Sequence, residues 1–251
     1  MRITTLGTSH GNPTASRFHS ATIMELDGRS YLVDAGYSAA DLMVRSGKEM
    51  RPLQAVFITH MHGDHVGGLP SLLTQYYNKK GDPDARMTVF LPEQGAVRAV
   101  EEWCRMLRLP WPVPGVDIAV YGPGEVYSDA SLKVTAEATR HLPALDGGVG
   151  SYALEFQAGK RRVIFTGDLS KNFSDFPQAA RTQPCDLCIC EVTHYRPADA
   201  LDILRACPIG RLVFSHVGDP WHDKGEQELL DMMRGLSYPV SVAHDGDVFE
   251  V

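Results

Sequence analysis

The sequence Thr59-His60-Met61-His62-Gly63-Asp64-His65-Val66-Gly67-Gly68 is the most informative stretch of the chain. It places three imidazoles and one carboxylate within six residues, directly after the apolar run 55–58. Neutral imidazole is a good zinc ligand, and a carboxylate can bind a harder cation or take a proton from water. Alternation predicts that His60 and His62 point the same way, whereas a tight turn at the next glycine would direct Asp64-His65 toward a second ion. The stretch therefore predicts a metal centre at the end of a strand.

The composition limits the class of protein. The 251 residues include 24 basic and 31 acidic ones, a net charge of −7, and 43% are hydrophobic, which is enough for a sizeable core and excludes a wholly disordered chain. The acidic balance, without a long Lys/Arg run, argues against a general nucleic-acid binder. No stretch approaches the roughly 20 apolar residues of a membrane span, and the polar, glycine-rich start lacks the apolar core of a signal peptide. Five irregularly spaced cysteines suit reduced thiols, so we expect a cytoplasmic protein with no membrane association.

Strand and helix patterns are expected to share the chain. Strands are predicted at residues 2–6, 21–26, 30–34, 55–58, 87–91, 116–121, 132–138, 151–157, 162–166, 187–192, 211–215, 239–243 and 248–251. Helices are predicted at residues 38–46, 67–77, 93–109, 173–181, 197–206 and 224–234. Asp27-Gly28 predicts a hairpin turn, and Gly81-Asp82-Pro83 predicts the end of a helix. Because no repeat or low-complexity linker interrupts residues 1–251, we expect a single domain with two sheets covered by helices.

The segment His60-Met61-His62-Gly63-Asp64-His65 resembles the His-x-His-x-Asp-His signature of the metallo-β-lactamase superfamily. Further pieces follow in the family's order over the whole chain. His141 resembles the third ligand of the first metal, Asp168 the carboxylate that bridges two ions, and His216 the last ligand. The resemblance implies an α/β protein: a four-layer αββα sandwich of two mixed β-sheets flanked by helices.

The resemblance also implies two divalent ions in one centre. It assigns His60, His62 and His141 to one ion, Asp64, His65 and His216 to the other, and Asp168 to both. Zinc is expected, and manganese or iron are alternatives because sites of this composition accept each of them. Two ions lower the pKa of a bridging water and hold an in-line displacement, and Asp64 would both ligate and orient the attacking hydroxide.

Other candidates are weaker. His194 follows Cys190-Glu191-Val192-Thr193, near the position where RNase Z-like members carry a Glu-x-Thr segment. It could protonate a leaving alkoxide or donate to a phosphate, and a surface-loop histidine is an equal alternative. His244 lies in a segment that resembles the family's final turn, which carries no metal. His10 is interpreted as a turn residue, and His222 as a loop residue that could line the mouth of the pocket. Cys185-x-x-Cys188-x-Cys190 is interpreted as core packing.

Several segments look like the RNase Z and cyclic-phosphate phosphodiesterase branch: Leu6-Gly7-Thr8, Pro13, Arg17 and Leu32-Val33-Asp34-Ala35-Gly36. Two departures set the chain apart. RNase Z carries a long tRNA-grasping arm between the third-ligand histidine and the bridging aspartate, where this chain has only 27 positions from His141 to Asp168. The branch's Gly-His-Ser-Thr segment is also missing. An acidic chain without the arm is poorly suited to tRNA, whose capture depends on cationic contacts.

We therefore expect a binuclear metal-dependent hydrolase, a phosphodiesterase that acts on a small or cyclic phosphate ester through metal-bound hydroxide. A lactonase or glyoxalase II-like thioester hydrolase shares the same signature, and an apolar pocket lined by Trp111, Trp221 or Tyr152 would favour it. A non-catalytic metal-binding sensor is a further alternative. His62 stands where flavodiiron members usually carry glutamate, which disfavours oxygen chemistry. The branch often dimerises, so a homodimer stays open, but no segment marks an interface.

Overall fold

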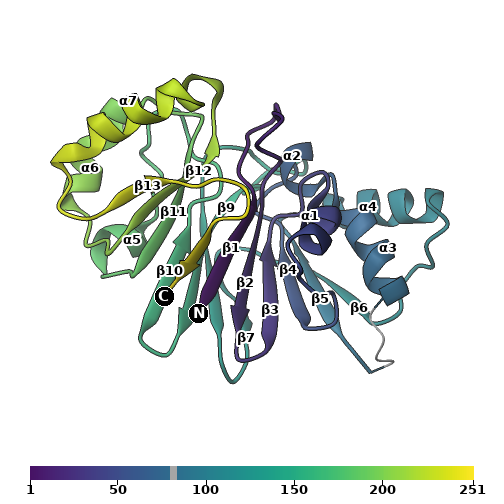
Figure 1. Ribbon diagram of the computed structural model, residues 1–251. Coiled ribbons are helices and arrows are strands. Elements are labelled where there is room, and N and C mark those ends of the chain that lie inside the picture. Colours follow the sequence, from purple (N-terminus) through teal and green to yellow (C-terminus); the bar gives the residue numbers. More distant parts are fainter. Residues whose placement is uncertain (80–83) are drawn as a thin grey trace.

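The computed structural model describes residues 1–79 and 84–251, so the predicted helix end at Gly81-Asp82-Pro83 lies outside the described residues. Within them, two seven-stranded sheets pack face to face, and helices cover both outer faces (Figure 1). One sheet has the strand order β14-β1-β2-β3-β4-β5-β6 and the other β13-β12-β11-β10-β9-β8-β7. The predicted four-layer αββα sandwich of the α/β class is confirmed.

The elements follow each other along the chain in the order of their numbers. The first sheet contains β1 (Arg2–Gly7), β2 (Ala21–Leu26), β3 (Arg29–Val33), β4 (Leu53–Phe57), β5 (Met87–Leu91), β6 (Val116–Val120) and β14 (Val248–Glu250). The second contains β7 (Gly124–Ser128), β8 (Lys133–Ala138), β9 (Tyr152–Ala158), β10 (Arg161–Phe165), β11 (Leu187–Val192), β12 (Leu212–Val217) and β13 (Val240–Val242). The helices are α1 (Ala39–Arg45), α2 (Gly63–Val66), α3 (Leu69–Lys79), α4 (Gln94–Met106), α5 (Gln178–Thr182), α6 (Pro197–Ala206) and α7 (Lys224–Met232), with 3₁₀ turns at Asp219–Trp221 and Met233–Gly235.

Both sheets are mixed, and chain connections explain why. Strands β1, β2 and β3 pair antiparallel, whereas β3 to β6 pair parallel. In the second sheet, β7 to β10 pair antiparallel and β10 to β13 pair parallel. The hairpin between β2 and β3 turns at Asp27 and Gly28, whose φ angles of 50° and 76° are those of a tight primed turn. Parallel neighbours require crossovers, and helices such as α3 and α6 supply them on the outer faces.

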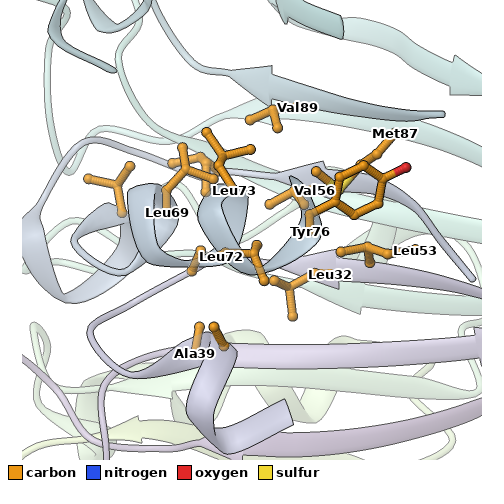
Figure 2. Packing of buried hydrophobic residues seen from close by; sticks show 14 of the residues in the cluster. Leu32, Ala39, Leu53, Val56, Leu69, Leu72, Leu73, Tyr76, Met87 and Val89 are labelled. Atoms are coloured by element: carbon orange, nitrogen blue, oxygen red, sulfur yellow. The ribbon is translucent and has the colours of Figure 1, made fainter. Parts of the chain in front are cut away.

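Three apolar layers hold the sandwich together. The layer between the sheets is rich in aromatic side chains, among them Phe57, which stacks on Phe90 at 4.9 Å between ring centroids. A second layer lies between the first sheet and helices α1, α3 and α4; Figure 2 shows Leu69, Leu73 and Tyr76 of α3 in it beside strand residues such as Val56. The third lies between the second sheet and helices α5, α6 and α7. Each layer removes apolar surface from water, which is the main source of stability.

The cysteines belong to these layers. All five are buried and free, and Cys188 and Cys190 of β11 pack in the third layer. Burial raises the pKa of the Cys190 thiol to about 12. The cysteines therefore act as small apolar side chains, as the sequence predicted.

The predicted helix at 173–181 is wrong in its first half. The helix there, α5, begins only at Gln178, after Pro177. Phe173 has a left-handed φ of 56° and stacks on Phe176 with their ring centroids 4.7 Å apart. The spacing of Phe173 and Phe176 is that of a helix, but both side chains are buried in the third layer from a turn. A tight turn was expected at Gly63, but this residue is the first of the short helix α2. Strand β7 was not predicted.

Strand ends at one edge of the sandwich carry the residues that the sequence singled out. His60 and His62 follow β4, Asp168 follows β10, and His194 follows β11. His216 is the next-to-last residue of β12. The segment after α2 packs closely on the loop after β3. A Cβ on Gly68 would lie only 2.1 Å from the carbonyl oxygen of Gly36, which is too close for any side chain. Glycine is therefore required there. In the described part of the chain, no helix has the length and apolarity that a membrane crossing requires.

Candidate metal centre

A first group of donor atoms comes from three strand ends. The Nε2 atoms of His60 and His141 each lie 3.1 Å from Nδ1 of His62. They lie 3.5 and 3.4 Å, respectively, from Oδ2 of Asp168. Ligands about 2.0–2.1 Å from a tetrahedral zinc ion are about 3.3 Å from each other. The spacing of this group thus suits a single divalent cation.

A second group lies on the other side of Asp168. The Nε2 atoms of His216 and His65 lie 3.1 and 3.6 Å from Oδ2 of Asp64. Oδ1 of Asp168 lies 3.4 Å from Nε2 of His65 and 3.7 Å from Nε2 of His216. Asp168 therefore presents one oxygen to each group, and the structure brings all seven predicted ligands together.

Two buried atoms of this centre test whether a cation fits. Nε2 of His65 and Oδ1 of Asp168 are buried and have no hydrogen-bond partner among the described residues. Leaving such atoms unpaired is costly, and the two face each other. A cation bound between imidazole and carboxylate donors would satisfy both. The residues present therefore fit a divalent metal ion.

Asp34 and Thr59 orient two of the imidazoles. Thr59 donates its backbone N–H and its hydroxyl to the Asp34 carboxylate, at 2.7 and 3.0 Å. Because this hydroxyl proton is committed, its oxygen accepts from Nδ1 of His60 at 3.1 Å. Nδ1 of His65 donates to Oδ2 of Asp34 at 2.7 Å. Both histidines thus carry the proton on Nδ1 and turn the lone pair of Nε2 into the centre.

Thr193 orients His216 in the same way. Its hydroxyl donates to the backbone carbonyl of His216 and accepts from Nδ1 of that residue at 3.1 Å. His216 and Asp34 have left-handed φ angles of 49° and 60°, which non-glycine residues rarely adopt. Strained backbone of this kind gathers at functional sites, where the surrounding contacts hold it.

The charges in the centre favour bound cations. Burial lowers the pKa of His60 and of His141, so both are neutral, which is the form that ligates. Burial also opposes protonation of His65, but the charges of Asp168 and Asp34 outweigh it and raise its pKa to about 10. Burial disfavours the charged form of Asp64, yet His216 and His65 hold its pKa well below the ordinary range. The carboxylates therefore demand positive charge that a metal would supply.

His194 lies beside the centre and is held by Glu191. Its Nδ1 is 3.1 Å from Oε1 of Glu191 and 3.7 Å from Oδ2 of Asp168, and its ring centroid is 4.3 Å from that of His141. Glu191 also accepts backbone N–H groups of Leu169, at 2.8 Å, and of His194 itself, at 3.0 Å. Burial lowers the pKa of His194, but its hydrogen bond to Glu191 and the charge of that carboxylate outweigh burial and raise it.

Sequence reasoning missed the supporting residues. Asp34 and Thr193 lie in segments that attracted attention for their resemblance alone, and nothing in the sequence says which imidazole each would hold. The one signal that could have revealed them is their position at a strand end. Asp34 follows β3, which pairs with β4, and Thr193 follows β11, which pairs with β12. His244 lies apart from the centre and pairs with Glu226 at 3.1 Å.

Comparison with known proteins agrees with this geometry. Residues 29–217 match the family model of the beta-lactamase superfamily domain. Ribonuclease BN of Escherichia coli O6:K15:H31 (strain 536 / UPEC) is 25% identical over 310 aligned positions that cover 100% of both chains. The metallo-beta-lactamase fold protein YhfI from Bacillus subtilis superposes with a TM-score of 0.79 at 21% identity, covering 99% of each chain. Human tRNase Z, short form, superposes with a TM-score of 0.75 at 20% identity, covering 100% of this chain and 99% of that one. The chain therefore belongs to the metallo-β-lactamase superfamily of hydrolases.

Proposed function

We propose that this hydrolase is a binuclear phosphodiesterase that acts on a small or cyclic phosphate ester. The observation that carries the proposal is the position of Asp168, whose two oxygens face two separate groups of donors. His60, His62 and His141 would hold one ion, Asp64, His65 and His216 the other, and Asp168 both. Zinc suits this donor set best, with manganese or iron as alternatives.

When bound, two divalent ions lower the pKa of a water molecule between them and neutralise charge on a phosphoryl group. Asp64 extends from the first turn of α2 to the edge of the second donor group. Its carboxylate would accept a hydrogen bond from the attacking water and hold that water in line with the scissile bond. A cavity of about 50 Å³, lined in part by His65, Asp168 and His216, has room for ordered water next to the centre.

His194 would assist departure of the leaving group. Glu191 engages Nδ1 of His194, which fixes the ring and leaves Nε2 as the atom that exchanges a proton with substrate. Donation of that proton to the leaving oxygen would prevent the release of an unstable alkoxide. Glu191 is held by backbone N–H groups, so the pair is positioned before substrate arrives.

The connection between His141 and Asp168 supports a small substrate. It consists of the loop 139–151 and the hairpin of β9 and β10, with no helical arm. The alignment with Ribonuclease BN extends over 310 positions, whereas this chain has 251 residues, so many positions of that protein have no counterpart here. A net charge of −7 is also unfavourable for holding a folded RNA.

Two of the three aromatic residues that would have favoured an acyl substrate, Tyr152 and Trp111, lie away from the predicted ligands. Tyr152 is buried in the layer between the sheets, against Tyr121. Trp111 lines a cavity of about 310 Å³ with Val97 and Pro112, and no predicted ligand lines it. The imidazole of His194 lies beside the predicted ligand His141 and can donate a hydrogen bond to a phosphate, for which an acyl chain has no use.

The test is hydrolysis by the zinc-loaded protein of three substrates in parallel: bis(p-nitrophenyl) phosphate, a lactone and a thioester. We expect metal-dependent cleavage of the phosphodiester, abolished in Asp168→Ala. Cleavage of the lactone or thioester alone would assign the protein to the carbon-ester branch, and inactivity on all three with metal bound would favour a sensor.

The size of the substrate is tested separately, with a 2′,3′-cyclic nucleotide and a precursor tRNA at matched concentrations of phosphodiester. We expect turnover of the cyclic nucleotide and none of the tRNA. Efficient cleavage of the tRNA would contradict the conclusion drawn from the missing arm.

A further inference from the structure

A second cluster of metal-ligating side chains lies outside the seven predicted ligands. His10, Asp219 and His222 each offer a donor atom, and these atoms lie within 4.8 Å of one another. His10 comes from the loop after β1, and the other two from the 3₁₀ turn after β12 and its C-cap. Residues far apart in the sequence thus converge at one point.

The cluster lies next to the metal centre. Ser9 pairs with Val217, the residue after His216, so the backbone of His10 is fixed close to the end of β12. The residue after His10 also lies close to the centre, because a Cβ on Gly11 would be 3.9 Å from Oδ2 of Asp64. The cluster therefore occupies the same edge of the sandwich as the seven predicted ligands but shares none of them.

Two details of the imidazoles point to a ligand. Nε2 of His222 lies 2.9 Å from the carbonyl oxygen of Val217, to which it donates its proton, so Nδ1 of His222 carries a lone pair. A backbone carbonyl that fixes the tautomer in this way is typical of metal-ligating histidines. In the His10 ring, Nε2 is the nitrogen that faces the cluster, 3.4 Å from Oδ1 of Asp219, whereas Nδ1 is buried and has no hydrogen-bond partner within residues 1–79 and 84–251.

An ion pair between His10 and Asp219 does not account for the cluster. Nε2 of His10 lies 3.4 Å from Oδ1 of Asp219, which is the contact such a pair would make. Burial, however, lowers the pKa of His10, so the ring is neutral, and the Asp219 side chain is 66% exposed, where a pair gains little. The hydrogen bond to Val217 fixes His222, but an ion pair between His10 and Asp219 involves no atom of this third residue.

We propose that His10, Asp219 and His222 form an additional binding site for a divalent cation of the zinc type. Two imidazoles and one carboxylate are a donor set that zinc accepts. Three protein ligands are one fewer than in a closed structural site, so an ion here would keep one position open to water or to an anionic group. The inference does not depend on the proposed phosphodiesterase reaction.

The test compares zinc bound per chain, by atomic emission after equilibrium dialysis at a fixed free zinc concentration. We expect His10→Ala, His222→Ala and the double variant each to lose the same single equivalent relative to the unaltered protein. His244→Ala, which removes an exposed histidine outside the cluster, should lose none. Because only differences are compared, the result is independent of how many ions the main centre holds.

Two outcomes would overturn the site. Unchanged zinc content in both single variants would show that the cluster holds no cation, and loss of two equivalents in the double variant would show that the two histidines do not share an ion. Asp219→Asn changes a side chain that is largely exposed. We therefore expect this variant to bind zinc more weakly while the thermal midpoint of the metal-free protein stays the same. Zinc binding by this variant equal to that of the unaltered protein would also contradict the proposal.

Discussion

Two carboxylates at opposite ends of the sandwich, Asp168 and Asp129, have different surroundings. Oδ1 of Asp129 accepts the backbone N–H groups of Ser131 and Leu132 at 2.7 and 2.8 Å. Its Oδ2 accepts the hydroxyls of Tyr31 and Tyr127, both at 2.8 Å, and so links β3 of one sheet to β7 of the other. Asp168, by contrast, has a buried Oδ1 without a hydrogen-bond donor among the described residues.

We interpret the difference as that between a carboxylate that stabilises the fold and one that is arranged to bind a cation. At Asp129 the chain supplies every donor, so the carboxylate stabilises the fold by itself. At Asp168, Oδ1 instead faces Nε2 of His65 and of His216 at 3.4 and 3.7 Å, and a bound cation would satisfy the carboxylate and both imidazoles together. Substitutions at the two ends should therefore affect different properties.

The largest effect is expected for Asp168→Ala. Because one carboxylate faces both donor groups, its removal should weaken the binding of both ions and lower kcat/KM for the phosphodiester at least about 1000-fold, or about 4 kcal/mol. Steady-state kinetics with saturating zinc measures the loss. Activity within tenfold of the unaltered protein would show that Asp168 is not a shared ligand.

His194→Gln should have the next largest effect, and it should depend on the leaving group. An alkyl phosphodiester needs a proton on its leaving oxygen, so we expect a loss of about 100-fold in kcat. Hydrolysis of a p-nitrophenyl ester, whose leaving group is stable as an anion, should change little. His244→Gln serves as the control. Equal losses for the two leaving groups would indicate that His194 only holds the structure in place.

Asp34→Asn should reduce zinc affinity, by up to about 100-fold, because the substitution disturbs the hydrogen bonds that orient His60 and His65. Competition with a chromophoric chelator measures the affinity. Asp129→Asn, at the other end of the sandwich, should bind zinc as the unaltered protein does. If both variants lost affinity equally, the effect would reflect general destabilisation.

Asp129→Asn should have the smallest effect, confined to stability. Burial opposes ionisation of Asp129, but the N–H group of Ser131 and the hydroxyls of Tyr127 and Tyr31 outweigh it and lower its pKa from 3.8 to about 2. A lowered pKa means that the ionised group stabilises the fold above pH 4, by about 2 kcal/mol, and that this contribution disappears as the pH falls from about 4 to about 2.

Urea denaturation of the metal-free proteins at several pH values measures that contribution. The difference in free energy of unfolding between unaltered protein and variant should be constant near neutrality and shrink below pH 4. A difference that did not depend on pH would show that the ionised form of Asp129 is not what the hydroxyls stabilise.

The strand and helix pattern predicted two sheets covered by helices, whereas the resemblance to the family, rather than the pattern, implied the donors His141, Asp168 and His216. The predicted ligands have a physical feature in common, because each lies close to the end of a strand. The structure brings the ends of β4, β8, β10 and β12 to one edge of the sandwich, and so brings His60, His141, Asp168 and His216 together.

Other features depend on tertiary contacts that a local pattern does not contain. Phe173 and Phe176 have helical spacing, but burial beside Tyr195 holds them in a turn. Strand β7 is a short edge strand with mixed exposure, so its pattern is weak. The meeting of His10 with His222 joins two loops, and loop conformation is the least predictable part of a chain.

The most direct measurement of the central claim is the zinc content of Asp168→Asn beside that of Asp129→Asn, after removal and return of the metal. We expect the Asp168 variant to stay folded without metal and to recover less zinc than the unaltered protein, by at least one ion per chain. The Asp129 variant should recover as much zinc as the unaltered protein and unfold at a lower urea concentration. Full recovery of zinc by Asp168→Asn would contradict the claim that this carboxylate is reserved for a cation.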